Sequence, residues 1–156
     1  MRLELLFPGK TREEYLARGI DDFAGRLRRY GEVTIKAVKS PKPGRGDDEA
    51  RLVREEGRLL LSRVAADVFL VALDPGGRLL DSPQLAELLA RWEEQGRSRL
   101  VFVLGGPLGL APEVLERADF TLSLSPLTFT HEMARLLLLE QLYRAWTIRQ
   151  GTGYHK

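Results

Sequence analysis

Apolar positions along the chain follow two patterns, one with a period of two residues and one with a period close to 3.6. Apolar and polar residues alternate over 2–7 and 32–38, and this alternation predicts two half-buried strands. Residues 68–73 and 100–104 are continuous apolar runs, which are typical of strands buried on both faces of a parallel sheet. A short strand is also predicted over 120–124. The chain is therefore expected to form five strands.

Helical spacing of apolar residues predicts helices between the strands and one more at the end of the chain. The first follows Thr11, which with Glu14 has the pattern of a capping box, and it runs through Tyr30. Ser82 and Pro83 are suited to be the N-cap and the first position of another helix. The remaining helices are predicted over about 48–62, after Pro112, and over about 130–150. Because strands alternate with helices, we predict an α/β fold with a mainly parallel sheet.

The length of 156 residues is that of one domain, and we expect residues 1–156 to form it. The longest apolar run, 68–73, has six residues, whereas a membrane-spanning helix needs ~20. Residues 1–7 hold Glu4 within their apolar run, and no small-residue cleavage site follows, so this segment is unlike a secretory signal. We therefore expect a cytoplasmic protein without a membrane partner.

The amino-acid composition excludes several classes of functional site. The chain has no cysteine and only two histidines, His131 and His155. Disulfides, thiolate ligands and cysteine nucleophiles are excluded, and neither histidine has a metal-ligand spacing, so we expect no metal. The formal net charge of +2 is too small to identify a nucleic-acid partner. The basic loop 39–47 is either a solvated surface loop or a flap that contacts phosphates.

Three loops rich in Gly, Pro or Ser follow apolar strands, at residues 73–77, 105–109 and 123–128. Within the first, Asp74-Pro75-Gly76-Gly77 is expected to end its strand. Ligands of parallel sheets bind where such loops leave the carboxyl ends of the strands, so these are the candidate binding loops. The glycine spacing in 105–109 differs from G-x-G-x-x-G, which disfavours a dinucleotide site.

The final predicted helix and the tail behind it carry the remaining candidate chemistry. The apolar surface of this helix is wider than one sheet requires, so it either contacts a second subunit or is buried on all sides within the domain. His131, in its first turn, is a capping or packing residue or a catalytic one, and Arg135 follows one turn later. Tyr154, His155 and Lys156 are either a disordered tail or a group that stacks on a base and contacts a phosphate of RNA.

Four ordered segments resemble one known family, and the resemblance covers the whole chain. They are 104–110, 122–131, 140–146 and 154–156. Together they are similar to the ribosomal RNA large subunit methyltransferase H family (RlmH) of the SPOUT superfamily. The resemblance implies an α/β fold with a C-terminal trefoil knot, a homodimer, and S-adenosylmethionine as cofactor. It also implies methylation of N3 of a pseudouridine in helix 69 of large-subunit (23S) ribosomal RNA, on the assembled ribosome.

The resemblance further implies roles for individual residues. His131 is the candidate base for the N3 proton, and Arg135 is expected to hold a substrate phosphate or to stabilise negative charge developing on the base. Tyr154 and His155 resemble the C-terminal pair of the family and are expected to reach the RNA or close the site, in one interpretation across the dimer. The cofactor is expected among the three loops, at Leu73, Gly105, Ser123, Leu124, Ser125, Pro126, Leu127 and Thr128.

Two other hypotheses stay open. A non-catalytic ribosome- or RNA-binding module of the same fold would bind RNA in a salt-dependent way without transferring a methyl group. A nucleotide-binding α/β enzyme of ordinary, unknotted topology would bind a dinucleotide, which the glycine spacing already disfavours.

Overall fold

Five parallel strands form a single sheet in the computed structural model, which describes residues 1–156. The order across the sheet is β2-β1-β4-β3-β5, and every neighbouring pair is parallel. The α/β class with a parallel sheet is therefore confirmed. The strands are β1 (Arg2–Pro8), β2 (Glu32–Val38), β3 (Phe69–Leu79), β4 (Arg99–Leu104) and β5 (Phe120–Ser123).

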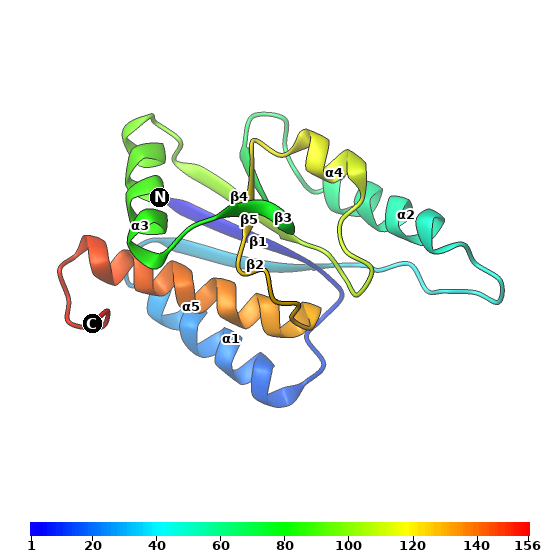
Figure 1. The fold of residues 1–156 in the computed structure, drawn as a ribbon, viewed down its shortest axis with the longest axis horizontal. Helices are drawn as coiled ribbons and strands as arrows, with labels where there is room; N and C mark the ends of the chain where they lie inside the picture. Colours follow the sequence, from blue (N-terminus) through cyan, green and yellow to red (C-terminus); the bar gives the residue numbers. More distant parts are fainter.

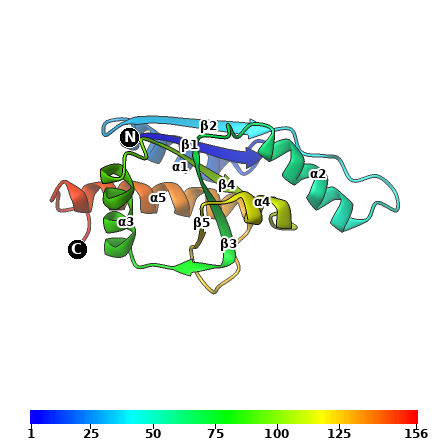
Figure 2. The same ribbon diagram turned by 90° about the horizontal axis from the view of Figure 1, so that it is seen from above.

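Helices cover both faces of the sheet (Figures 1 and 2). Three helices, α1, α3 and α5, pack on one face, where α5 lies between the other two. The short α4 and the longer α2 pack together on the opposite face. The helices are α1 (Glu14–Leu27), α2 (Glu49–Leu61), α3 (Ser82–Glu94), α4 (Pro112–Arg117) and α5 (His131–Arg149).

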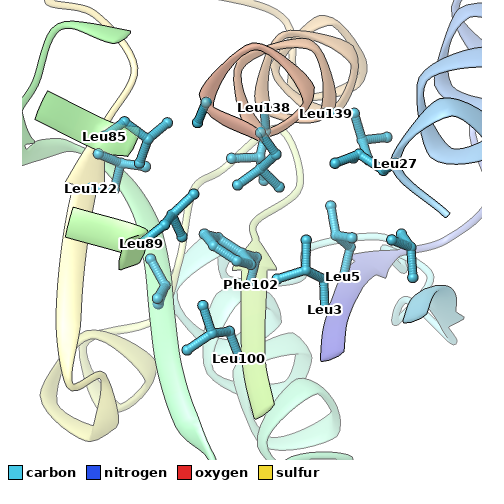
Figure 3. Packing of buried hydrophobic residues seen from close by; sticks show 14 of the residues in the cluster. Leu3, Leu5, Leu27, Leu85, Leu89, Leu100, Phe102, Leu122, Leu138 and Leu139 are labelled. Carbon is cyan, nitrogen blue, oxygen red and sulfur yellow. The ribbon is translucent and has the colours of Figure 1, made fainter. Parts of the chain in front are cut away.

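The core has two parts, one on each side of the sheet, because successive residues of a strand point to opposite faces. Leu5 and Phe102 point toward α1, α3 and α5, where Leu138 and Leu139 of α5 pack over them (Figure 3). Their neighbour Leu6 belongs to the smaller cluster under α2 and α4. Because both faces are covered, the central strands are apolar at nearly every position, as the continuous runs predicted.

Strand β3 is longer than the sequence indicates. The prediction that Asp74-Pro75-Gly76-Gly77 ends this strand is wrong, because β3 pairs with β5 again at Arg78 and Leu79 after a register shift. A Cβ on Gly77 would lie 2.7 Å from the carbonyl oxygen of Thr121, so glycine is required for the close approach of the two strands. The Pro-Gly segment is therefore an irregularity within a strand pair.

Two predicted helix starts are also wrong. The N-cap of α1 is Glu13 and makes no side-chain cap bond, so Thr11 and Glu14 do not form a capping box. The N-cap of α3 is Asp81, which forms a capping box with Gln84, so Ser82 is already helical. Local patterns located both helices but placed their N-caps two residues and one residue away.

None of the helices is both long enough and apolar enough to cross a bilayer. The trefoil knot implied by the resemblance stays a prediction.

Candidate active site

A cavity of about 730 Å³ lies at the carboxyl ends of β4 and β5 and beside the irregular middle of β3, where the three predicted binding segments meet. The starts of α1 and α5 complete its wall. The lining includes six of the eight positions expected to hold the cofactor, namely Leu73, Gly105, Leu124, Ser125, Leu127 and Thr128. Ser123 is buried behind the wall, where its hydroxyl donates to the carbonyl of Ser125 at 3.3 Å, and Pro126 is exposed outside the cavity. These two residues shape the loop and do not line the cavity.

The loop after β4 turns back on itself very tightly. Gly106 and Gly109 form an isolated bridge, with the N–H of Gly109 donating to the carbonyl of Gly106 at 3.0 Å. A Cβ on Gly105 would lie 2.6 Å from the backbone of Gly109, and Gly109 itself has a φ of 83°. Glycine at these positions brings bare backbone to the surface of the cavity.

The loop after β5 presents apolar side chains at the cavity mouth. The hydroxyl of Ser125 accepts the N–H of Leu127 at 2.9 Å, and Thr130 caps α5 by accepting the N–H of Met133 at 3.2 Å. Leu127 is 71% exposed and Phe129 is 36% exposed, although both line the cavity. The mouth is therefore more apolar than a typical protein surface.

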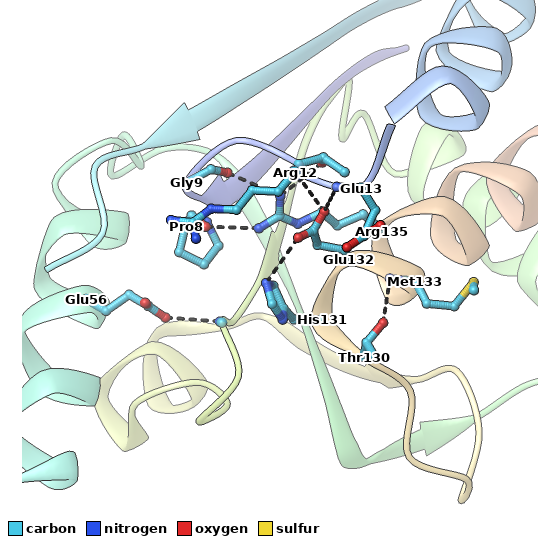
Figure 4. Close-up of polar contacts among 12 residues, drawn as sticks. Pro8, Gly9, Arg12, Glu13, Glu56, Thr130, His131, Glu132, Met133 and Arg135 are labelled. Carbon is cyan, nitrogen blue, oxygen red and sulfur yellow. Dashed lines mark hydrogen bonds and ion pairs between the residues drawn. The ribbon is translucent and has the colours of Figure 1, made fainter. Parts of the chain in front are cut away.

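His131 lines the cavity from the first turn of α5 (Figure 4). Burial and the positive charge of Arg135 lower the pKa of this histidine below its usual 6.5, despite the opposing charges of Glu132 and Glu56. No hydrogen bond occupies the imidazole, whose Nε2 lies 3.8 Å from Oε2 of Glu132. A neutral imidazole facing a cavity is able to accept a proton near neutral pH.

Glu132, which the sequence did not single out, fixes the start of α1. Its Oε1 accepts the N–H of Arg12 at 2.6 Å and the N–H of Glu13 at 3.0 Å (Figure 4). Burial alone would raise the pKa of Glu132, but these two donors and the charges of Arg135 and His131 lower it. An ionised carboxylate on α5 thus binds the backbone of the two residues that lead into α1.

Arg135 is fully buried and does not line the cavity. Its guanidinium donates to the carbonyls of Pro8 at 2.9 Å and Gly9 at 3.2 Å, and to the hydroxyl of Thr11 at 3.0 Å. The same group lies 4.7 Å from the ring centre of Phe7, and burial lowers its pKa. The structure therefore places Arg135 behind the site, where it holds the segment between β1 and α1.

The C-terminal tail folds back onto α5 and α1. The hydroxyl of Tyr154 donates to Oε1 of Glu140 at 3.0 Å, and its ring packs edge-on against Tyr143 with 4.8 Å between centroids. Arg144 bonds the same carboxylate and lies 3.4 Å from Nδ1 of His155. Burial and the neighbouring Glu140 raise the pKa of Tyr154. The tail is an ordered part of the fold.

The structure does not bring the tail and His131 together within one chain. Neither Tyr154 nor His155 lines the cavity. Glu140, which Tyr154 contacts, lies about 14 Å along α5 from His131, at 1.5 Å per residue. No group of three or more His, Asp or Glu side chains is arranged to hold a metal ion.

A match to a known family accompanies this geometry. The family described as “Predicted SPOUT methyltransferase” matches residues 1–155. The chain belongs to the SPOUT methyltransferase family. Among its SPOUT relatives is the “Ribosomal RNA large subunit methyltransferase H” of Desulfotalea psychrophila, which is 46% identical over the full length of both chains. The protein of the same name from Syntrophotalea carbinolica is 44% identical over 99% of each chain.

A solved structure has a similar fold. A probable methylase family protein from Haemophilus influenzae matches with a TM-score of 0.56, covering 99% of this chain and 70% of that one. At 15% identity this likeness concerns the fold.

Proposed function

We propose that this protein is an S-adenosylmethionine-dependent methyltransferase of large-subunit (23S) ribosomal RNA. The observation that carries the proposal is the cavity at the carboxyl ends of β4 and β5 and the irregular middle of β3, built from the segments that match the RlmH pattern. Full-length identity to relatives named for rRNA methylation supports the RNA substrate. The finer proposal is N3 of a pseudouridine in helix 69, modified on the assembled ribosome. An enzyme acting on ribosomes would work in the cytoplasm.

The residues of the cavity suit S-adenosylmethionine. Leu73, Leu124 and Leu127 supply apolar walls for the adenine and the methionine chain, and Gly105 exposes backbone beside them. The carboxylate of Asp74 lies on the same wall and complements a positively charged ligand. We propose that these residues, with Ser125 and Thr128, hold the cofactor, while Ser123 and Pro126 shape the loop. When bound, the cofactor supplies a methyl group already activated by its sulfonium.

The remaining task of the protein is to orient the target base and to remove its N3 proton. We propose that a ring nitrogen of His131 accepts this proton, because the imidazole lines the cavity and its pKa is lowered. Arg135 then acts as a positioning residue, since its guanidinium already donates hydrogen bonds to Pro8, Gly9 and Thr11. Together with burial, its charge lowers the pKa of His131, and its contacts hold the segment beside the cavity.

A homodimer is part of the proposal. The outer side of α5 carries Met133 and Leu137 half-buried, and the cavity mouth leaves Leu127 and Phe129 exposed. A second copy packed on this apolar surface would cover it. Because the cavity lies at one end of α5 and the tail at the other, a dimer with antiparallel α5 helices would bring Tyr154 and His155 of one copy to the cavity of its partner.

The test of the activity is transfer of a labelled methyl group from S-adenosylmethionine to assembled ribosomes that lack the modification, followed by mapping of the labelled nucleotide. Label on a pseudouridine of helix 69 is the expected result. Label on another nucleotide would replace the proposed target. Cofactor binding without any label would favour the non-catalytic RNA-binding module.

The test of the composite site mixes two inactive variants, His131→Ala and Tyr154→Ala. If the site combines residues of two copies, mixed dimers hold one intact site, and random exchange restores activity to about a quarter of the wild-type level. No recovery after verified subunit exchange would contradict a site shared between copies.

A further inference from the structure

The loop between β4 and α4 is held from outside the cavity by a carboxylate on α2. Oε1 of Glu56 accepts the N–H of Gly106 at 3.1 Å (Figure 4). Its Oε2 accepts the hydroxyl of Ser40 at 3.0 Å. Gly106 lines the cavity, whereas Glu56 and Ser40 do not. Glu56 therefore joins the back of the cavity wall to α2 and to the start of the basic loop 39–47.

This contact sets the direction of one peptide group. All peptide bonds of the chain are trans, and a trans peptide points its N–H and its C=O in opposite directions. Because the N–H of Gly106 points toward α2, the carbonyl of Gly105 points away from α2, the direction in which the cavity lies. No N–H of the protein donates to that carbonyl, so it is free to accept a hydrogen bond from a ligand.

Little space is left around the carboxylate of Glu56 and around the next residue of its helix. A Cβ on Gly106 would lie 3.1 Å from Oε2 of Glu56, so a side chain there would push the carboxylate away. The next residue of α2, Gly57, is buried so close to Ala111 that an added Cβ would come within 2.6 Å of the alanine Cβ. The helix is thus packed directly against the residues that follow the loop, and Glu56 has a rigid base.

We propose that Glu56 is a positioning residue for the cofactor loop, which fixes the Gly105–Gly106 peptide and thereby sets the affinity for S-adenosylmethionine. This inference rests on the proposed function, since it concerns the same cavity. The contact with Ser40 extends the same arrangement to the basic loop, so the phosphate-binding flap predicted for 39–47 would share a partner with the cofactor loop.

The test distinguishes the effect of the length of the Glu56 side chain from the effect of its charge. Glu56→Gln keeps an oxygen at the same distance but loses the charge, whereas Glu56→Asp keeps the charge but is one methylene too short. Glu55→Asp is the matched control, because Glu55 is the neighbouring half-exposed carboxylate and makes no hydrogen bond or ion pair. For each variant we would measure the dissociation constant for S-adenosylmethionine by calorimetry, the melting temperature, and hydrogen exchange of the Gly106 amide by NMR.

We expect Glu56→Asp to weaken cofactor binding about tenfold and to expose the Gly106 amide to exchange, since one charge-assisted hydrogen bond is lost. Glu56→Gln is expected to stay within about twofold of the wild type, as is Glu55→Asp. Wild-type affinity in Glu56→Asp would overturn the inference, as would equal weakening by Glu56→Gln, which would assign the effect to charge. Wild-type protein that binds no S-adenosylmethionine would instead overturn the proposed function.

Discussion

Replacing Arg135 with methionine tests whether this arginine supports the site or contacts the substrate. Methionine keeps most of the side-chain volume but removes three hydrogen bonds, to Pro8, Gly9 and Thr11. It leaves two backbone carbonyls without these partners and Glu132 without a nearby positive charge. A buried carbonyl stripped of its partner costs about 1–3 kcal/mol, so the two carbonyls together cost about 4 kcal/mol. We therefore expect a loss of about 4 kcal/mol in the free energy of unfolding.

Urea denaturation measures this loss directly. With a slope of about 2 kcal/mol per molar urea, the midpoint of Arg135→Met is expected about 2 M below that of the wild type. Arg135→Lys, which keeps the charge but not the planar fork of donors, should fall between the two. Arg18→Met is the control, since Arg18 is exposed on α1 and makes no hydrogen bond, ion pair or cation–π contact, and it should change stability by less than about 0.5 kcal/mol.

One outcome would refute this reasoning. If Arg135→Met unfolds at the wild-type urea concentration but has lost methyl transfer, the buried contacts contribute little. Arg135 would then have to reach the RNA directly, as the resemblance implied, through a rearrangement of the segment between β1 and α1.

Three further outcomes follow from the same structure. His131→Ala should abolish methyl transfer while S-adenosylmethionine still binds in calorimetry, and retained activity would remove His131 as the base. Because folding lowers the pKa of His131, the unfolded chain binds a proton more tightly than the folded one. The free energy of unfolding should therefore decline as the pH falls below 6.5, and this decline should be smaller in His131→Gln. Gly57→Ala should lower the free energy of unfolding, measured in urea, by about 1–3 kcal/mol through its clash with Ala111. Gly25→Ala, whose added Cβ meets no atom within 4 Å, should instead raise it by about 0.5–1 kcal/mol. Equal effects of the two substitutions would contradict the packing account.

Periodicity predicted the five strands and five helices because buried positions carry apolar residues at the spacing of the local strand or helix. The run 100–104 is apolar at every position since β4 is central and covered on both faces. The convergence of three loops at one edge was equally predictable, because parallel strands end on the same side of a sheet. The order of the strands was not, since pairing between β1 and β4 joins residues almost a hundred positions apart.

Two of the three errors, at the start of α1 and at the end of β3, occur where a distant group replaces a local one. Thr11 has the residue type and spacing of an N-cap, but its hydroxyl accepts a hydrogen bond from Arg135, 124 positions away. The N–H groups that a local cap would satisfy are bound instead by Glu132, from the first turn of α5. Likewise, Asp74-Pro75-Gly76-Gly77 has turn chemistry, yet β5 supplies partners that continue the strand. A single sequence carries no signal for such partners.

These long-range contacts make the first turn of α5 the point on which the site depends. His131 faces the cavity because Glu132 and Arg135, on the same turn, are fixed to the segment between β1 and α1. The catalytic candidate therefore owes its position to two neighbours on its own helix. Changes in residues 8–13, which bind these two neighbours, should consequently alter the pKa of His131, and NMR titration of the chain's two histidines can measure it.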